Sequence, residues 1–155
     1  MSEQMSQKET DVLELLQKRY SEYNQFYNHA KINIEKSFAG YALQTMEANK
    51  KTHANIYGKL HGGAMMTMAD SCSSAACASL GKKVVTLDCR INFFANVDLP
   101  AKVTCEANVV HNGKKTIIMA AQVYDKDRTV LARMQSTYFV LGVFEEIAEI
   151  MQRTE

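Results

Sequence analysis

Asp70 is the only charged residue within positions 64–80, a stretch composed of Ala, Met, Thr, Ser, Cys and Leu. An ionised carboxylate among such neighbours loses favourable hydration unless hydrogen-bond donors or a cleft compensate for the loss. A carboxylate held in this way can act as a base or as a nucleophile. The alternative is structural: the side chain bonds a neighbouring backbone group, or pairs with Arg90 or a lysine.

The histidines and cysteines give no comparable signal. His29, His53 and His111 share no ligand spacing with one another or with the cysteines, so no metal site is expected. The cysteines form no C-x-x-C pair, and a chain of 155 residues needs no disulfide staples. We therefore expect reduced thiols and a cytoplasmic protein; the four residues are Cys72, Cys77, Cys89 and Cys105.

The composition is that of one globular domain, with 46% hydrophobic and 23% charged residues. A formal net charge of +1 supplies no field that would hold a nucleic acid or an anionic lipid surface, so neither partner is expected. The N-terminal residues lack the apolar core of a signal peptide, and 64–80 is too rich in small and polar residues to make a good bilayer span.

The segment 64–80 must position Asp70, and its composition predicts an unusual helix. A helix of this length extends over about 25 Å at 1.5 Å per residue. With a single charge it lacks the Lys- and Glu-rich outer face of a surface helix, so it must be covered on every side. The simplest cover is a sheet, and the sequence therefore predicts an α+β fold in which a curved antiparallel sheet of about five strands wraps around a central helix.

Alternation of apolar and polar residues predicts the strands of that sheet. The pattern is weaker between Ser37 and Lys50, and clearer at 84–94, 102–111, 116–125 and 130–141. In the strand at 84–94 it places Val85, Leu87, Cys89, Ile91 and Phe93 on one face and Thr86, Asp88, Arg90 and Asn92 on the other. Asn112-Gly113 predicts a tight hairpin, since both turn positions need positive φ.

Two further helices are expected to flank the sheet. Apolar residues recur at helical spacing from Ser6 to about Asn28, and Ser6 with Glu9 forms a capping box. A short amphipathic helix is expected at 144–153. The chain thus divides into an N-terminal helix and lead-in (1–36), a central domain (37–142) and a short C-terminal helix or tail (143–155).

The residues before the central helix resemble a family signature. The motif N-x-x-G-x-x-H-G-G-x6-D, formed here by Asn55, Gly58, His61, Gly62, Gly63 and Asp70, is similar to that of hotdog-fold acyl-CoA thioesterases of the phenylacetic acid degradation type. The strand at 85–93 and the turn at 112–115 are also similar, so the resemblance spans roughly 38–141. It implies a hotdog thioesterase domain in a homodimer, usually paired into a tetramer, that hydrolyses acyl-CoA to acid and CoA without a cofactor.

Thioester hydrolysis needs an oxyanion donor, a base or nucleophile, and a placed water. Gly62 and Gly63 lack Cβ, so an acyl carbonyl can approach their amides at the start of the helix, and Gly62 is the expected donor. Asp70 is expected to activate water or to attack the carbonyl itself, and both routes stay open. The resemblance implies that Asn55 positions the thioester or the water and that Thr86 helps to position the same water. It also implies that His61 shapes the turn and contacts the thioester region.

Six further positions are expected to bind substrate: Gly63, Met66, Asn96, Gly113, Lys114 and Lys115. Met66 belongs to a methionine cluster that either fills the core or lines an acyl pocket. Lys114 and Lys115 offer cations for the phosphates of CoA. After Asn92-Phe93 the family often has a basic residue and a proline, whereas this chain continues Phe-Ala-Asn-Val at 94–97, a departure in the region expected to contact CoA.

Helix geometry predicts that the site is shared between two subunits. Gly62 and Asp70 are about 12 Å apart along one helix, whereas a donor, a carbonyl and an attacking group span about 7 Å. We therefore expect Asp70 to act on a carbonyl held by Gly62 of a second copy. Two other functions remain open: a non-catalytic acyl-CoA binding module, and a hotdog dehydratase or hydratase that uses His61. The identity of the acyl group, aryl, short or medium, is also open.

Overall fold

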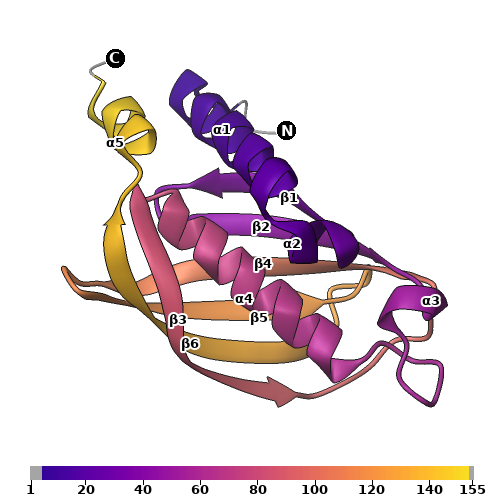
Figure 1. The fold of residues 1–155 in the computed structure, drawn as a ribbon. Helices are drawn as coiled ribbons and strands as arrows, with labels where there is room; N and C mark the ends of the chain where they lie inside the picture. Colours follow the sequence, from indigo (N-terminus) through magenta and orange to yellow (C-terminus); the bar gives the residue numbers. More distant parts are fainter. Residues whose placement is uncertain (1–4, 154–155) are drawn as a thin grey trace.

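The computed structural model describes residues 5–153, so the outermost parts of the predicted flanking segments, 1–4 and 154–155, lie outside the described residues. One antiparallel sheet curves around helix α4 (Gly62–Ala78) (Figure 1). This arrangement confirms the predicted α+β fold. The sheet has six strands in the order β1-β2-β4-β5-β6-β3, with bounds β1 Ile32–Phe38, β2 Tyr41–Ala48, β3 Lys82–Phe93, β4 Ala101–Asn112, β5 Thr116–Tyr124 and β6 Val130–Val143.

The sequence did not predict strand β1, because about five strands were expected and its first residues fall in the predicted lead-in, nor the short helix α3 (Lys50–His53), where a loop was expected. Strand β1 pairs antiparallel with β2, from Ile32 opposite Met46 to Phe38 opposite Tyr41. The register shifts between Ile34 and Lys36, so the burial of alternate side chains is interrupted within the strand. This irregularity hides the period-two pattern from a reading of the sequence.

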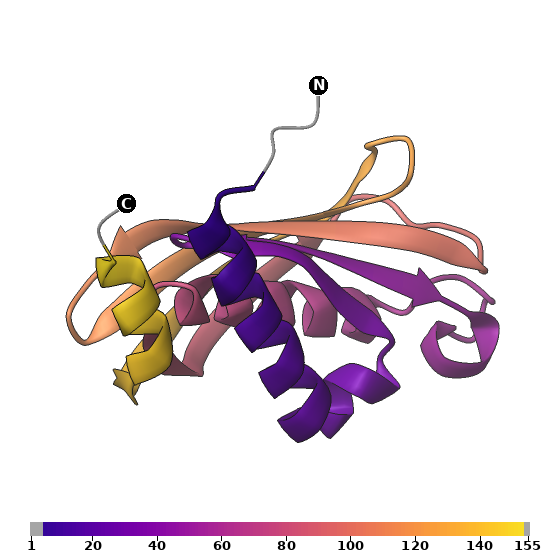
Figure 2. The ribbon, with the colours of Figure 1, turned by 90° about the horizontal axis from the view of Figure 1, so that it is seen from above.

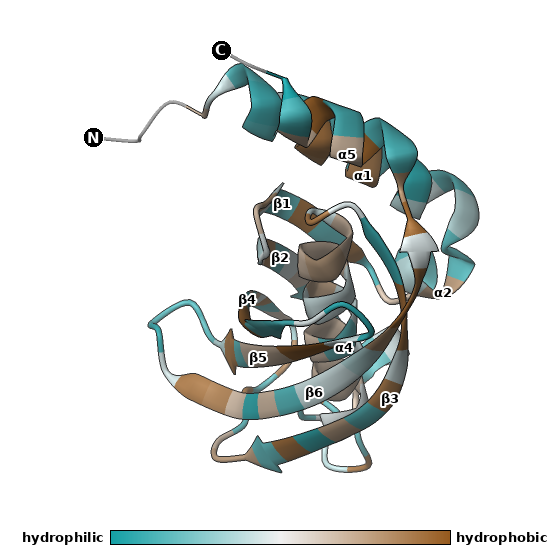
Figure 3. Cartoon of the chain, turned by 90° about the vertical axis from the view of Figure 1, so that its left-hand side faces the viewer, coloured by the Kyte–Doolittle hydropathy of each residue, from teal (hydrophilic) through white to brown (hydrophobic). Residues whose placement is uncertain are grey.

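Helix α4 lies against the concave face of the sheet, which buries one side of it. The predicted cover on every side is wrong for the opposite side, where Met66 is 37% exposed and Asp70 is half-buried. Figure 3 shows the strands curving past the helix, and Met65, Met68 and Cys72 of α4 are fully buried. Small residues allow strands to approach the helix backbone closely: the Ser37 hydroxyl on β1 donates to the carbonyl of Ala75 at 3.1 Å. Close packing of this kind fixes the rotation of α4 and therefore the direction in which Asp70 points.

The predicted N-terminal helix is two helices, α1 (Gln7–Tyr23) and α2 (Gln25–His29). The capping box of Ser6 and Glu9 is present at the start of α1. Asn24 breaks the helix with φ −107° and ψ 79°, and its side chain accepts a hydrogen bond from the amide of Tyr27 to start α2. The break turns α2 toward α4, while α1 lies across β1 and next to the closing helix α5 (Glu145–Gln152) (Figure 2).

Strand β3 forms one edge of the sheet, with β6 as its neighbour, and its predicted alternation is wrong in one respect. Its register with β6 shifts at Leu87, which forms a β-bulge. Because a bulge inserts one extra residue, Thr86 and Cys89, predicted on opposite faces, line the same pocket beside α4. Val85 and Leu87 are correspondingly exposed, at 45% and 60%.

Candidate active site

The carboxylate of Asp70 is held by two hydroxyl groups. Thr86 Oγ1 on β3 donates to Asp70 Oδ1 at 2.9 Å, and Tyr138 on β6 donates to the same oxygen at 2.8 Å. No ion pair to Asp70 occurs within residues 5–153, and Arg90 lies in a different pocket with Arg133. The salt-bridge alternative is therefore not realised, and Oδ2 has no hydrogen-bond partner in the described part of the chain.

A pocket of about 500 Å³ opens beside this carboxylate, between α4, α2 and β3. Four of the predicted site residues line it: Gly63, Met66, Asp70 and Thr86. The remainder of its wall includes Phe26 and Tyr27 of α2 and Cys89 of β3. An open, largely apolar pocket with one carboxylate is suited to an organic ligand that is attacked near that carboxylate.

The tyrosine and cysteine side chains near Asp70 are neutral at neutral pH. Burial raises the pKa of Tyr20 and of Cys77 to about 12, and it raises the pKa of Tyr138 further, with the charge of Asp70 as the second cause. Burial also raises the pKa of Cys89, and the charge of Asp70 adds to this effect. Cys89 is therefore a thiol rather than a reactive thiolate, which leaves Asp70 as the candidate reactive side chain of this pocket.

The start of α4 presents one free amide. His61 is the N-cap residue, and its Nδ1 accepts a hydrogen bond from the Gly63 amide at 2.8 Å. The amides of Ala64 and Met65 are bonded to the His61 carbonyl, whereas that of Gly62 has no partner within residues 5–153. Because a free amide at the positive end of a helix favours negative charge, Gly62 is well suited to bind an oxyanion. The expected contact of His61 with a thioester stays a prediction.

Two predicted residues, Asn55 and Asn96, are engaged in the loop that precedes α4. Asn55 Oδ1 accepts hydrogen bonds from the amides of Tyr57 and Lys59 at 2.9 and 3.1 Å. This leaves the Asn55 side-chain NH2 group to act on a ligand. Asn96 donates to the Leu60 carbonyl at 3.0 Å and accepts from the next amide in the chain, so both ends of its side chain hold the loop. The substrate roles of both asparagines stay predictions.

The β4–β5 hairpin lies at the opposite end of α4 from Gly62. Lys82, which follows α4, donates to the Gly113 carbonyl at 2.9 Å and to the side chain of Asn112. Lys114 and Lys115 are exposed there, about 25 Å along the helix from its first residue. Within one chain these lysines therefore do not share the pocket of Asp70, and neither do Asn55, His61 or Asn96.

The sequence reasoning missed Tyr138, Phe26 and Tyr27. Tyr138 contacts Asp70 because it pairs with Thr86 across β3 and β6, and strand register of this kind cannot be deduced from periodicity. A signal for the other two was available: Asn24 is a favourable N-cap residue, so a new helix beginning after it could have been predicted.

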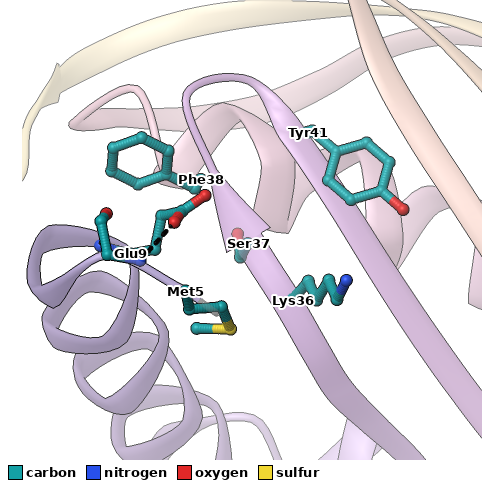
Figure 4. A pocket seen from close by; sticks show the side chains of 7 residues that line it. Met5, Glu9, Lys36, Ser37, Phe38 and Tyr41 are labelled. Atoms are coloured by element: carbon teal, nitrogen blue, oxygen red, sulfur yellow. Dashed lines mark hydrogen bonds between the residues drawn. The ribbon is translucent and has the colours of Figure 1, made fainter. Parts of the chain in front are cut away.

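A second pocket, of about 570 Å³, lies between the start of α1 and the β1–β2 hairpin (Figure 4). Its one carboxylate belongs to Glu9, which accepts a hydrogen bond from the backbone amide of Ser6 at 2.7 Å. Figure 4 shows Glu9 turned back onto this helix start, with Lys36 and Tyr41 extending from the hairpin. The carboxylate is committed to helix capping, so this pocket is a weaker candidate for chemistry.

Within residues 5–153, no group of three His, Cys, Asp or Glu side chains is placed to hold a metal ion. In the same range, no helix combines the length and the hydropathy that crossing a bilayer requires.

Comparison with known proteins identifies relatives of this fold and sequence. The family described as the thioesterase superfamily matches residues 57–132. A protein of Saccharolobus solfataricus that is provisionally named an esterase is 29% identical over 118 residues, which cover 75% of this chain and 77% of that protein. The acyl-coenzyme A thioesterase PaaI of Escherichia coli is 28% identical over 111 residues, which cover 72% and 79% of the two chains.

Solved structures extend the comparison. The Escherichia coli PaaI structure superposes with a TM-score of 0.80 at 22% identity, covering 86% of this chain and 96% of that one, a likeness that shows the fold. A thioesterase-like protein of Streptococcus pneumoniae, solved with coenzyme A, gives a TM-score of 0.69 at 29% identity and covers 72% and 87%.

Two further structures of the streptococcal protein are of variants in which an aspartate or a threonine is replaced by alanine, and these two residues are 16 positions apart. Asp70 and Thr86 are also 16 positions apart. Residues 57–132 thus match the thioesterase superfamily, and the chain is a thioester hydrolase with the hotdog fold.

Proposed function

We propose that the chain hydrolyses acyl-CoA thioesters to a free acid and CoA, with Asp70 as the base or nucleophile and the backbone amide of Gly62 as the oxyanion donor. The observation that carries the proposal is a carboxylate with one oxygen held by two hydroxyls and the other unpartnered among the described residues, beside a pocket of about 500 Å³. The name of the Escherichia coli relative and the coenzyme A in the streptococcal structure support CoA as the leaving group.

The chemistry follows from these two groups. As the carbonyl carbon is attacked, its oxygen becomes negative and is stabilised by the Gly62 amide at the start of α4. Asp70 either removes a proton from the attacking water or attacks first and forms an anhydride that water then cleaves. The carbon–sulfur bond breaks and CoA leaves as the thiolate or thiol. Single-turnover hydrolysis in ¹⁸O-labelled water identifies the second route when water cleaves the anhydride at the Asp70 carboxyl carbon, since only this attack places label in Asp70.

A dimer is required because Gly62 and Asp70 of one chain are about 12 Å apart along α4, farther than the roughly 7 Å that the reacting groups span. Strand β3 supports the dimer: it is an edge strand of 12 residues with exposed apolar side chains. Such an edge pairs readily with a second copy. Antiparallel pairing of two β3 strands also sets the two α4 helices antiparallel, which brings Asp70 toward the partner's Gly62.

The same symmetry bears on Lys114 and Lys115. In their own chain, the two lysines lie near the C-terminal end of α4. In the antiparallel pair, this end of each helix lies beside the N-terminal end of the other helix. The lysines of one subunit therefore approach the Gly62 end of the other, where CoA enters. Ammonium groups there would bind the phosphates of CoA. Pairing of two such dimers into a tetramer completes the proposed assembly.

Replacing Leu87 with Glu tests the dimer. Leu87 lies near the middle of β3 and is 60% exposed, so in symmetric antiparallel pairing its two copies come close to the two-fold axis. We expect like charges there to oppose association and to lower turnover per chain at least about tenfold at low protein concentration. Sedimentation velocity and turnover, measured on the same dilution series, report both effects.

The matched control is Leu141→Glu, the same change on the inner strand β6 at a side chain that is 63% exposed. It is expected to keep the dimer and the activity. Full activity of a monomeric Leu87→Glu protein would contradict a site shared between subunits.

A thiol-release assay with aryl-, short- and medium-chain acyl-CoA esters tests the function itself. We expect the wild-type protein to release CoA from at least one class, with the preferred ester determined by the pocket between α2 and α4. Tight binding of esters without release would instead indicate a non-catalytic module. A change in enoyl absorbance without thiol release would indicate a dehydratase or hydratase.

A reducing compartment suits the cysteines of this chain. Cys72, Cys77 and Cys105 are buried, Cys89 is half-buried, and all four are free thiols. Free thiols persist where glutathione and thioredoxin keep them reduced. We therefore place the enzyme in the cytoplasm.

A further inference from the structure

We infer that Tyr138 is a positioning residue for Asp70: its hydroxyl fixes the carboxylate so that Oδ2 faces the pocket, and it favours the ionised form that catalysis needs. This inference rests on the proposed function of Asp70. Tyr138 is fully buried, and its hydroxyl lies 2.8 Å from Asp70 Oδ1 and 3.1 Å from the Asp70 carbonyl oxygen. It therefore contacts the catalytic residue at both its side chain and its backbone.

Hydroxyl groups compensate the charge of Asp70. No cation pairs with Asp70 among residues 5–153, so hydroxyl donors are what compensate the carboxylate for lost hydration. Hydrogen bonds to the charged form of an acid stabilise that form. Thr86 supplies one donor from the edge strand β3, where its residue is exposed, and Tyr138 supplies the other from the interior of the sheet.

Tyr138 itself stays protonated. Burial raises its pKa well above the ordinary value for a phenol, and the charge of Asp70 raises it further. The phenol therefore remains a donor throughout the working range of the enzyme. The other titratable side chains facing this region are Tyr20 on α1, Tyr27 on α2, Cys77 on α4 and Cys89 on β3, and burial raises the pKa of each, so all are neutral as well.

The two hydroxyl groups also fix the orientation of the Asp70 carboxylate. Both donors bind Oδ1, and two hydrogen bonds to one oxygen from two different strands restrict rotation of the carboxylate. Oδ2 is the atom that remains available to water or to the thioester carbon. A small misplacement of a reacting group lowers the reaction rate strongly. A buried donor that holds the carboxylate in one orientation therefore favours catalysis.

Tyr138→Phe tests the inference, because it removes the hydroxyl and keeps the ring. We expect kcat to fall about tenfold while KM changes less than about twofold, because the hydroxyl acts on Asp70 and not on substrate. We also expect the acidic limb of the pH–rate profile to move toward neutral pH, because a hydrogen bond to the charged form of an acid stabilises that form. A purely structural role would not move this limb.

Tyr124→Phe is the matched control. It removes a buried hydroxyl from the neighbouring strand β5, where the tyrosine ring stacks under the Arg128 guanidinium with 3.8 Å between the guanidinium carbon and the ring centroid. We expect its kcat and pH profile to equal those of the wild type. Incorporating 3,5-difluorotyrosine at position 138 gives a second variant that keeps the shape and strengthens the donor, and the acidic limb is expected to move to lower pH.

The outcomes separate this inference from the function on which it rests. A wild-type protein that releases no thiol from any acyl-CoA contradicts both. An active wild-type protein whose Tyr138→Phe and difluorotyrosine variants keep the wild-type kcat and acidic limb overturns the role of Tyr138 and leaves the thioesterase function standing. Shifts of the acidic limb in opposite directions in the two variants support the inference. If Tyr138→Phe does not fold, the shift of the acidic limb in the difluorotyrosine variant tests the role of Tyr138 alone.

Discussion

Asp70→Asn is expected to lower kcat for acyl-CoA hydrolysis about 10³-fold, because the amide can neither remove a proton from water nor attack the thioester carbon. The substitution keeps the size of the side chain, and the amide oxygen can still accept the hydrogen bonds from Thr86 and Tyr138. The fold and the affinity for substrate are therefore expected to change little. Thiol release under saturating acyl-CoA measures the loss, and thermal unfolding checks the fold.

Asp88→Asn is the control for this change. Asp88 is an exposed residue on β3, two positions beyond Thr86 and on the other side of the bulge at Leu87. The same loss of one negative charge there is expected to leave kcat unchanged. If Asp70→Asn retained the wild-type kcat, Asp70 would be neither the base nor the nucleophile, and the proposed mechanism would fail.

Gly62→Pro is expected to lower kcat by about 10²- to 10³-fold, the typical cost of losing one oxyanion donor. Proline removes the backbone amide hydrogen that the proposal assigns to the thioester oxygen. The helix tolerates it, because Gly62 is the first helical residue and proline is favoured there. His61 already has φ −70° and ψ 136°, the extended conformation that a residue before proline adopts.

Gly62→Ala separates the lost hydrogen bond from the added bulk. A Cβ at this position meets the end of the Phe93 ring at 3.2 Å, so both variants require that ring to move slightly. Alanine keeps the amide, and we expect it to retain most of the activity that proline loses. Equal kcat values for the two variants would show that the Gly62 amide does not stabilise the transition state.

Much of the fold could be predicted from local sequence. The capping box at Ser6 specifies the start of α1, and the scarcity of charge in 64–80 specifies a helix covered by a sheet. Period-two patterns located four strands to within a few residues, because β4, β5 and β6 each have one face in the core and alternate side chains of β3 are partly buried. These signals are carried by neighbouring residues, so they need no knowledge of the tertiary fold.

The features that escaped prediction depend on pairing between distant segments. The irregularities at Ile34 and Leu87 break the alternation of β1 and β3, and a bulge is defined by the partner strand rather than by its own residues. The same holds for the contact between Tyr138 and Asp70, which are 68 positions apart in the chain. Asp70 and Gly62 could thus be predicted as candidate site residues, because their residue types suggest chemistry. Tyr138, which contacts Asp70, could not.

The break at Asn24 has a consequence for how selectivity can change. It places Phe26 and Tyr27 in the wall of the pocket that contains Asp70, although they lie outside the segment that carries the reactive groups. Mutations in this short helix can therefore reshape the space offered to the acyl chain while Asp70, Thr86 and Tyr138 keep their hydrogen bonds. Part of the acyl site that we propose is therefore encoded in a separate stretch of the gene from Asp70, so evolution or directed engineering can alter that part of the wall without replacing the proposed reactive group.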